Sequence, residues 1–375
     1  MGKIKLLFMI ESMKAGGAER QLHELMTGLS PQEFEVKLIT WVDNPPFFDS
    51  EPPYLWKCYP RRSKFDFKAI ITAAQLLKKG QADMVHGFLD TGNFYAAMAR
   101  QLAGKGVIIA SERSSKRKLS LLQRWHKPWA HRRASLTICN SLEGQKFIQT
   151  MGVPESHTMV IVNGINTQLF HPKAAQEIPD LKESLGLKAD RRYLISVGRI
   201  APVKNQLETI KAFAASNVKE GYDLLLVGAS QRDYEILINQ EVENLGLHSQ
   251  VKIIPPVKNI QEYYQVCDVL VLFSLREGTP NALLEAMACG LPCVVSDVGD
   301  CPKYVQPRVS GWVVPSRAID RLSKAFDEIA KTDPTQLRTM GASAKQSLID
   351  LMMDKSSMIQ KFTRAYKSLH RQTTP

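Results

Sequence analysis

The fold is decided by the stretch DVLVLFSLREGTPNALLE, residues 268–285. Its first part, residues 268–273, is an apolar run typical of a buried strand. Pro280 suits the first turn of a helix, which makes Gly278 and Thr279 the loop that enters it. A buried strand that passes through a short glycine-containing loop into a helix is the repeating unit of a parallel, doubly wound sheet.

Two acids, Glu277 and Glu285, flank the start of this expected helix. The N–H groups of Asn281, Ala282 and Leu283 would lie in its first turn, where unpaired amides and the helix dipole attract an anion. Carboxylates accept hydrogen bonds from the hydroxyls of a sugar or a ribose. The pattern predicts a site for a phosphate-bearing sugar or nucleotide, and the alternative is a pair of surface acids that stabilise a helix start.

Short apolar runs alternate with longer amphipathic segments along the whole chain, which predicts repeated βα units. The expected strands of the first half are residues 4–10, 35–41, 84–88, 107–110, 136–139 and 159–162. Those of the second half are residues 193–197, 223–227, 251–254, 268–273, 292–296 and 311–314. We therefore expect an α/β fold with two Rossmann-like, doubly wound domains.

The two series of strands are separated by residues 170–190, a polar segment without a strong period that contains Pro172 and Pro179. We expect an N-terminal domain over residues 1–168, a linker over 169–190 and a C-terminal domain over 191–355. Parallel α/β domains bind ligands outside the carboxyl ends of their strands, so we expect the two domains to face each other across a ligand cleft.

Length and composition limit the class of protein. The 375 residues suffice for two domains of about 150 residues, and 44% hydrophobic with 23% charged residues is ordinary for a globular protein. A peptide hormone, a zinc finger and a disulfide-stapled mini-protein are excluded. No apolar run approaches the roughly 20 residues that cross a bilayer, and the N-terminus lacks the features of a signal peptide, so we expect a cytoplasmic protein.

The six cysteines contain no CxxC pair, which predicts reduced and mostly buried thiols. Cys289, Cys293 and Cys301 are spaced unlike a common zinc site and have no histidine nearby, so we expect no bound metal. An Asp-x-Asp motif is absent from the sequence.

The formal net charge of +12 is concentrated in the N-terminal half, where residues 1–167 carry 23 Lys and Arg against 14 Asp and Glu. Residues 113–133 hold eight of these cations and no acid, interleaved with Leu and Trp. Such a segment suits an anionic membrane surface or the diphosphate of a lipid carrier. A solvated helix face is one alternative. Nucleic acid is another, which we do not favour because no nucleic-acid module accompanies the charge.

Two cations follow the first strand of the second half. Arg199 comes directly after Val197 and Gly198 at the strand end, and Lys204 lies in the same loop. Two cations at a strand end can bind the oxygens of a phosphate group. The alternative for Arg199 alone is a solvated arginine.

These features together resemble the family 4 retaining glycosyltransferases of the GT-B fold. The residues from Glu277 to Glu285, followed by AMACGLP at 286–292, resemble the family's Glu-x7-Glu motif. The stretches 197–199 with 204–205, 162–166 with 170–172, and AGGAER at 15–20 resemble its diphosphate-binding pair, its strand-end signature before the linker and its glycine loop.

The resemblance implies a donor site held chiefly by the C-terminal domain. Arg199 and Lys204 would bind the donor diphosphate, Glu285 the ribose hydroxyls and Glu277 the hydroxyls of the transferred sugar. The base would lie near Val257. The remaining donor-binding candidates are backbone positions, namely Gly16, Gly17, Gly278, Thr279, Pro280, Asn281, Ala282 and Leu283.

The expected acceptor site lies at the end of the strand 84–88. Phe88 stands where many family members carry a histidine, and the form FLDTGN at 88–93 resembles the branch that elongates lipid-linked oligosaccharides. Asp90 is then the candidate that holds or activates the acceptor hydroxyl, and a helix-capping role is its alternative. The other acceptor-binding candidates are Glu19, Arg20, His86, Asn93, Arg113, Lys116, Arg117 and Lys118.

The resemblance implies a metal-independent retaining enzyme without a cofactor, which transfers a sugar from a nucleotide sugar to a lipid-linked glycan at the inner face of the cytoplasmic membrane. UDP is the more common nucleotide of the family and GDP the less common. The last helix, residues 356–375, would cross back to the N-terminal domain. A GT-B epimerase or phosphorylase, and a non-catalytic basic binding protein, remain the alternatives.

Overall fold

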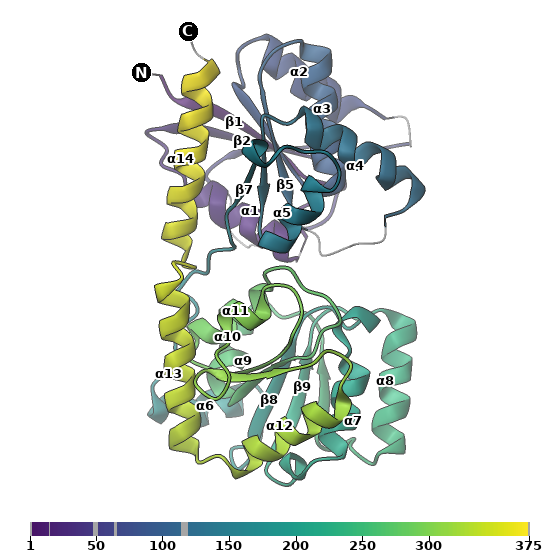
Figure 1. The fold of residues 1–375 in the computed structure, drawn as a ribbon, viewed down its shortest axis with the longest axis vertical. Coiled ribbons are helices and arrows are strands. Elements are labelled where there is room, and N and C mark those ends of the chain that lie inside the picture. Colours follow the sequence, from purple (N-terminus) through teal and green to yellow (C-terminus); the bar gives the residue numbers. More distant parts are fainter. Residues whose placement is uncertain (1, 15, 48–51, 64–65, 114–118, 374–375) are drawn as a thin grey trace. The chain divides into compact units, whose positions relative to one another are not determined.

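The computed structural model describes residues 2–14, 16–47, 52–63, 66–113 and 119–373. Internal contacts divide the chain into a first unit, Met1–Gly164 with Lys355–Pro375, and a second unit, Ile165–Asp354. Each unit is a parallel sheet flanked by helices (Figure 1). None of the described helices combines the length and the apolar character that a membrane span needs.

In the described part of the first unit the sheet order is β3-β2-β1-β4-β5-β6-β7, and all neighbours are parallel. The strands are β1 (Ile4–Met9), β2 (Phe34–Thr40), β3 (Leu55–Cys58), β4 (Met84–Phe88), β5 (Val107–Glu112), β6 (Leu136–Cys139) and β7 (Thr158–Val160). The strand order reverses between β1 and β4. This reversal is the topological switch point, where an open α/β sheet forms its binding crevice.

Helices cover both faces of this sheet: α1 (Gly17–Gly28), α2 (Lys68–Lys78), α3 (Leu89–Ala103), α4 (Leu121–Arg133), α5 (Leu142–Gln149), the short η1 (Glu155–His157) and α14 (Lys355–Thr373). Leu7, Met9 and Trp41 pack with α2, α3 and α4 on one face. Phe8 and Phe34 pack with α1 and α14 on the other, where Figure 1 shows α14 in yellow beside β1 and β2.

The C-terminal helix α14 is part of the core of the first unit. Its Phe362 and Tyr366 are fully buried, and their rings lie 5.9 Å apart. The Tyr366 hydroxyl lies 2.8 Å from Nδ1 of His86 on β4. A polar contact thus ties α14 to the central part of the sheet.

We expect Tyr366→Phe to destabilise the chain by about 1–3 kcal/mol, because it leaves a buried imidazole nitrogen without its partner. Urea-induced unfolding measures the change. Tyr95→Phe is the matched control, since the Tyr95 hydroxyl has no hydrogen-bond partner among the described residues, and it should cost less than about 0.5 kcal/mol. Equal effects of the two variants would contradict the assigned role of the His86 contact.

In the described part of the second unit the order is β10-β9-β8-β11-β12-β13, again with parallel neighbours. The strands are β8 (Arg192–Val197), β9 (Tyr222–Val227), β10 (Val251–Ile254), β11 (Val269–Leu272), β12 (Cys293–Ser296) and β13 (Gly311–Val314). Here the order reverses between β8 and β11, so the switch point lies between the loops that follow these two strands.

The helices of the second unit are α6 (Ile178–Ser184), α7 (Gln206–Ala214), α8 (Arg232–Asn244), α9 (Ile260–Val266), α10 (Asn281–Ala288), α11 (Cys301–Tyr304), α12 (Ile319–Lys331) and α13 (Pro334–Asp350), with the short turns η2 (Ala175–Glu177), η3 (Pro202–Lys204) and η4 (Asn217–Glu220). Phe213 of α7 and Phe326 of α12 are fully buried in the main core, together with residues of β8, β9 and β11.

Every expected strand is present, with ends that differ by a few residues. The structure adds β3, a short edge strand whose four residues alternate between exposed and half-buried. It also adds η2 and α6 inside the segment 169–190, which the sequence indicated as a linker. Lys182 of α6 donates to the Arg191 carbonyl at 2.7 Å, which fastens this segment to the second unit.

Candidate functional site

The loops after β8 and β11 meet at the switch point of the second unit. Leu275 N–H donates to the Val203 carbonyl at 2.8 Å, so the two loops lie against each other. The first loop carries Lys204 and the second carries Glu277. Residues far apart in sequence are therefore brought together at the place where the topology predicts a crevice.

Lys204 and Glu277 form an ion pair, with Nζ 2.6 Å from Oε1. The side chains are 21% and 9% exposed, so the pair lies at the boundary between solvent and core. Both residues were predicted from the sequence, but their mutual contact was not. Arg199, the second expected cation, is exposed in the same loop as Lys204, and its carbonyl accepts a hydrogen bond from Gln206.

The loop after β12 supports the backbone of Glu277. Gly299 adopts φ +59°, and a Cβ at this position would lie 2.3 Å from the Glu277 carbonyl oxygen. Only glycine fits both the left-handed backbone and the close approach. Cys301 follows this loop, and burial together with the Glu277 charge raises the pKa of its thiol, which keeps it protonated.

Glu285 is almost fully buried on α10 and accepts a hydrogen bond from the Tyr264 hydroxyl at 3.0 Å. The Tyr264 ring is itself fixed by an edge contact with Phe170, with 6.1 Å between the ring centroids. The orientation of this carboxylate is therefore determined by aromatic packing. Sequence reasoning identified Glu285 and missed Tyr264, because no local pattern links the two.

Helix α10 begins one residue later than expected, and one amide of its first turn is hydrogen-bonded within the chain. Pro280 precedes the helix, which begins at Asn281. The Leu283 N–H donates to the Pro280 carbonyl at 3.2 Å, so it does not point outward as the sequence suggested. Thr279 lies beside the helix start with its hydroxyl 3.3 Å from that of Tyr304. Ala282, in the first turn of the helix, is half-buried.

Two further polar side chains lie in these loops and were not found from the sequence as ligand candidates. Asn205 Nδ2 and Ser274 Oγ are buried and have no hydrogen-bond partner within the described residues. Buried polar atoms without a partner are rare in folded proteins, and an ordered water or a bound ligand can supply the missing hydrogen bond. Val257, the expected neighbour of a base, follows β10, which is two strands from β8.

The glycine loop of the first unit precedes α1. Gly16 is the residue before the helix and Gly17 begins it. The Glu19 carboxylate folds back toward Gly16, where a Cβ would lie 2.2 Å from Oε2. Burial raises the pKa of Glu19, while its own backbone amide and Lys14 oppose the rise. Glu19 therefore occupies the helix N-terminus, and Arg20 beside it is half-buried.

His86 and Asn93, two expected acceptor contacts, are buried instead. Nε2 of His86 lies 2.8 Å from the Ser111 hydroxyl, in addition to its contact with Tyr366. Burial and Arg113 lower the pKa of His86 far below its usual value, so the ring is neutral. The Asn93 amide exchanges two hydrogen bonds with the Ser111 backbone. The expectation that His86 and Asn93 contact the acceptor is therefore corrected. In the structure both side chains connect strands and helices and present no surface to a ligand.

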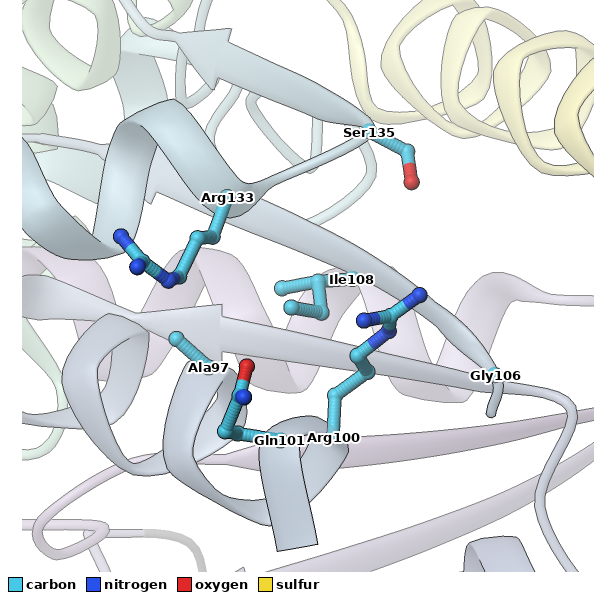
Figure 2. A pocket seen from close by; sticks show the side chains of 7 residues that line it. All are labelled: Ala97, Arg100, Gln101, Gly106, Ile108, Arg133 and Ser135. Atoms are coloured by element: carbon cyan, nitrogen blue, oxygen red, sulfur yellow. The ribbon is translucent and has the colours of Figure 1, made fainter. Parts of the chain in front are cut away.

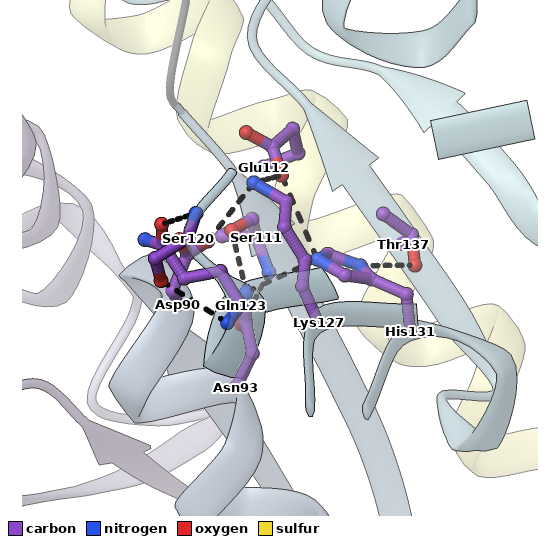
Figure 3. Close-up of polar contacts among 9 residues, drawn as sticks. All are labelled: Asp90, Asn93, Ser111, Glu112, Ser120, Gln123, Lys127, His131 and Thr137. Atoms are coloured by element: carbon purple, nitrogen blue, oxygen red, sulfur yellow. Dashed lines mark hydrogen bonds and ion pairs between the residues drawn. The ribbon is translucent and has the colours of Figure 1, made fainter. Parts of the chain in front are cut away.

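Asp90 belongs to a buried polar network (Figure 3). Its carboxylate lies 2.9 Å from Nζ of Lys127 and accepts a hydrogen bond from Gln123 at 2.9 Å, both on α4. Lys127 is 1% exposed and also pairs with Glu112 at 2.7 Å. The helix-capping alternative for Asp90 is wrong, since α3 begins at Leu89 with Asp90 inside its first turn.

The charges of this network are fixed by their surroundings. Burial lowers the pKa of Lys127, but the carboxylates of Glu112 and Asp90 outweigh it, and the net pKa is raised. Burial and Lys127 lower the pKa of His131 to about 3, with Asp90 opposing. A charged lysine therefore lies between two carboxylates beside a neutral imidazole. Asp90 is 20% exposed and is the most exposed of the four ionisable side chains Asp90, Glu112, Lys127 and His131.

The basic segment 113–133 is less uniformly exposed than the sequence indicated. Arg113 donates to Asn163 at 2.8 Å and lies 4.9 Å from the Phe88 ring centroid. Burial lowers the pKa of Arg113 to about 10, which leaves it charged at neutral pH. Arg113 and Lys127 are therefore largely structural, which corrects their place among the surface cations. Lys116, Arg117 and Lys118 lie outside the described residues.

The thiol prediction is confirmed: all six cysteines are free, and all but the half-buried Cys58 are buried. In the part of the chain that the structure describes, no group of three or more His, Cys, Asp or Glu side chains gathers as a metal site would require.

Two Rossmann-like units on one chain, each with polar residues at its switch point, define the GT-B class. Solved structures agree. Anabaena Alr3699/HepE in complex with UDP and glucose has a TM-score of 0.84 at 21% identity and covers 97% of this chain and 100% of that chain. WaaG, a glycosyltransferase involved in lipopolysaccharide biosynthesis, has a TM-score of 0.74 at 17% identity, with 95% and 98% covered. The expected GT-B fold is confirmed.

The family follows from two further matches. The model described as Glycosyltransferase Family 4 matches residues 15–169, and the model described as Glycosyl transferases group 1 matches residues 177–347. Together they cover most of the chain. The chain belongs to the family 4 glycosyltransferases.

Curated relatives extend over three quarters of the chain. The Escherichia coli UDP-Gal:alpha-D-GlcNAc-diphosphoundecaprenol alpha-1,3-galactosyltransferase is 28% identical over 296 residues, 76% of this chain and 75% of the relative. A Campylobacter jejuni alpha-1,4-N-acetyl-D-galactosaminyltransferase, whose named acceptor is a diNAcBac-PP-undecaprenol saccharide, is 26% identical over 299 residues, 76% of this chain and 77% of the relative. Both relatives are named for acceptors carried on undecaprenol.

Proposed function

We propose that this glycosyltransferase moves a sugar from a UDP-sugar, with retention of anomeric configuration, to a saccharide carried on a polyprenyl diphosphate. The observation that carries the proposal is the Lys204–Glu277 pair at the switch point of the second unit. It joins a cation for a diphosphate to a carboxylate for sugar hydroxyls, and Glu285 lies on the helix that follows.

The cationic and the acidic residues of the site have different proposed roles. Lys204 and the exposed Arg199 stabilise the negative charge of the leaving diphosphate, together with the N-terminal end of α10. Glu277 accepts hydrogen bonds from the hydroxyls of the transferred sugar, and Glu285 accepts them from the ribose. Two cations and a helix dipole supply the charge that a metal ion supplies in other transferases, so we propose that the reaction needs no metal and no cofactor.

Retention requires that the new bond form on the face from which the nucleoside diphosphate leaves. The leaving diphosphate is then the nearest base for the incoming hydroxyl, and the cations that hold it set its position. Asp90 is the proposed acceptor contact of the first unit, because it is the most exposed ionisable side chain of the buried network. Lys127 and Gln123 hold its carboxylate in one orientation.

The relatives support the proposed acceptor and donor. Their names specify undecaprenyl-linked saccharides, and one of them names UDP-Gal as the donor. An acceptor of this kind remains in the membrane, so we propose that the enzyme acts as a peripheral protein at the cytoplasmic face of the membrane. An epimerase or a phosphorylase of the same fold is the alternative enzyme, and a non-catalytic binding protein is the alternative of another class.

We expect UDP to raise the melting temperature of the protein more than GDP, ADP or CMP does, because a ligand that binds only the folded state stabilises it. Glu285→Ala should weaken the UDP effect by removing the ribose contact. Glu243→Ala, at an acid near the end of α8 in the same unit, is the matched control and should keep the full effect. Absence of stabilisation by every nucleotide would overturn the proposed donor site.

A further inference from the structure

The surface formed by α3 and α4 is cationic over a long stretch of sequence. Residues 89–142, which include both helices, contain ten Lys and Arg but only two acids, Asp90 and Glu112. Their side chains are 20% and 1% exposed, and both are paired with the buried Lys127. The described part of this stretch therefore presents exposed cations, and its two acids are already paired with a buried lysine.

The same surface exposes large apolar side chains. Leu121, Leu122 and Trp125 are 84%, 68% and 61% exposed at the start of α4. Leu122, Trp125 and Trp129 follow a helical spacing and lie along one stripe. The Trp125 ring stacks with that of Trp129 at 6.3 Å, and Phe94 of α3 lies 5.4 Å from Trp129. Clustered aromatic and aliphatic groups of this size on a surface mark an interaction site.

A small cationic pocket lies at the other end of the two helices (Figure 2). It has a volume of about 130 Å³ and includes Arg100 at the end of α3, Arg133 at the end of α4, and Ser135. Figure 2 shows the two arginines on either side of Ile108. The Arg133 guanidinium also lies 4.4 Å from the Trp129 ring centroid, which joins the pocket to the aromatic stripe. Guanidinium and hydroxyl donors suit phosphate oxygens.

We infer that this α3–α4 face, made of Arg100, Leu121, Leu122, Trp125, Trp129 and Arg133, docks the protein on an anionic phospholipid surface. Helix α4 lies in the plane of the interface, with its leucines and Trp125 among the acyl chains and headgroups. Arg100 and Arg133 bind lipid phosphates from the pocket. The inference deepens the proposed function and rests on it for the membrane-bound acceptor.

The charges and the apolar side chains of the α3–α4 face indicate which partner binds there. A protein partner with an acidic surface would match the arginines but not two adjacent leucines that are this exposed. An anionic bilayer supplies both an apolar layer and a plane of phosphates, in the order that the face presents them. The rear of α4 is fixed to the sheet by Lys127, so the face is presented without a change of fold.

The test is co-sedimentation of the full chain with vesicles at low ionic strength, without nucleotide. We expect binding to phosphatidylcholine vesicles that contain phosphatidylglycerol, and little binding to phosphatidylcholine alone. Arg100→Gln with Arg133→Gln should weaken binding about 25-fold, at about fivefold per charge removed. Arg232→Gln with Arg338→Gln, two exposed arginines of the second unit, is the matched control and should change it less than twofold.

A second pair of variants tests the apolar part. Leu121→Ser with Leu122→Ser should weaken vesicle binding at least tenfold, whereas Ile349→Ser, at a half-exposed position on α13, should leave it unchanged. Tryptophan emission should shift to the blue on binding, and Trp125→Phe should reduce the shift while binding is kept. All of these side chains are exposed, so the melting temperature should not change.

Equal binding to both vesicle types, or wild-type binding by the arginine or leucine variants, would overturn the inference. The outcome is separable from that of the proposed function. Stabilisation by UDP without vesicle binding rejects the docking face alone. Vesicle binding without stabilisation by UDP rejects the donor site alone.

Discussion

Lys204→Ala is expected to lower the rate of sugar transfer by about 10²–10³-fold, the usual cost of removing one preorganised group that stabilises transition-state charge. The ammonium lies at the switch point, next to the carboxylate expected to hold the sugar. It can therefore stabilise the diphosphate as negative charge develops on it. Transfer kinetics at saturating donor measure the effect, since the loss should fall mainly on kcat.

Lys211→Ala provides the control, because Lys211 is a half-exposed lysine on the following helix, paired only with the nearby Glu208 in the described contacts. Its activity should equal that of the wild type.

Glu277→Gln should also lower the rate of sugar transfer. The double variant should lose less than the product of the two single losses, because Lys204 and Glu277 act as a pair. Transfer by Lys204→Ala within about threefold of wild type would contradict the assigned role.

Lys127→Met is expected to destabilise the protein by about 3–5 kcal/mol, the range for removal of one partner from a buried ion pair. The variant leaves Asp90 and Glu112 without the cation that lies 2.9 Å and 2.7 Å from them. Urea-induced unfolding of the full chain measures the loss.

Arg124→Met is the matched control for Lys127, since Arg124 is exposed on the same helix and should cost less than about 0.5 kcal/mol. Glu112→Gln in the Lys127→Met background should recover part of the stability, because it removes one of the two uncompensated charges. A loss below about 1 kcal/mol, or a further loss on adding Glu112→Gln, would refute the description of this network.

The strands could be predicted from the sequence because they depend on local apolar runs, whereas the switch points depend on the order of the strands in each sheet. The β3 strand could not, because its four residues are half-exposed and show no apolar run. Helix α6 was missed for a related reason: its stability comes from contacts such as that of Lys182 with Arg191, and not from a strong amphipathic pattern.

Within the candidate site, the sequence identified residues but not their partners. Lys204 and Glu277 each stand in a recognisable motif, yet their pairing over 73 residues depends on the order of β8 and β11 in the sheet. The sequence indicated Lys127 as a surface cation of the basic segment 113–133. The two carboxylates that pair with it lie on other elements, so no local sequence pattern indicates that it is buried. The sequence also predicted that His86 contacts the acceptor. Its partners Ser111 and Tyr366 are distant in sequence, so no local pattern indicates that they hold its ring in the core.

The linkage in the product shows whether this chain transfers a sugar with retention. The purified protein is incubated with a UDP-sugar and a polyprenyl-diphosphate-linked saccharide, and the anomeric configuration of the new linkage is read by NMR. We expect an α-linked product from an α-linked donor, with one UDP released per sugar transferred. A β-linked product, or turnover of the donor without a new glycosidic bond, would contradict it.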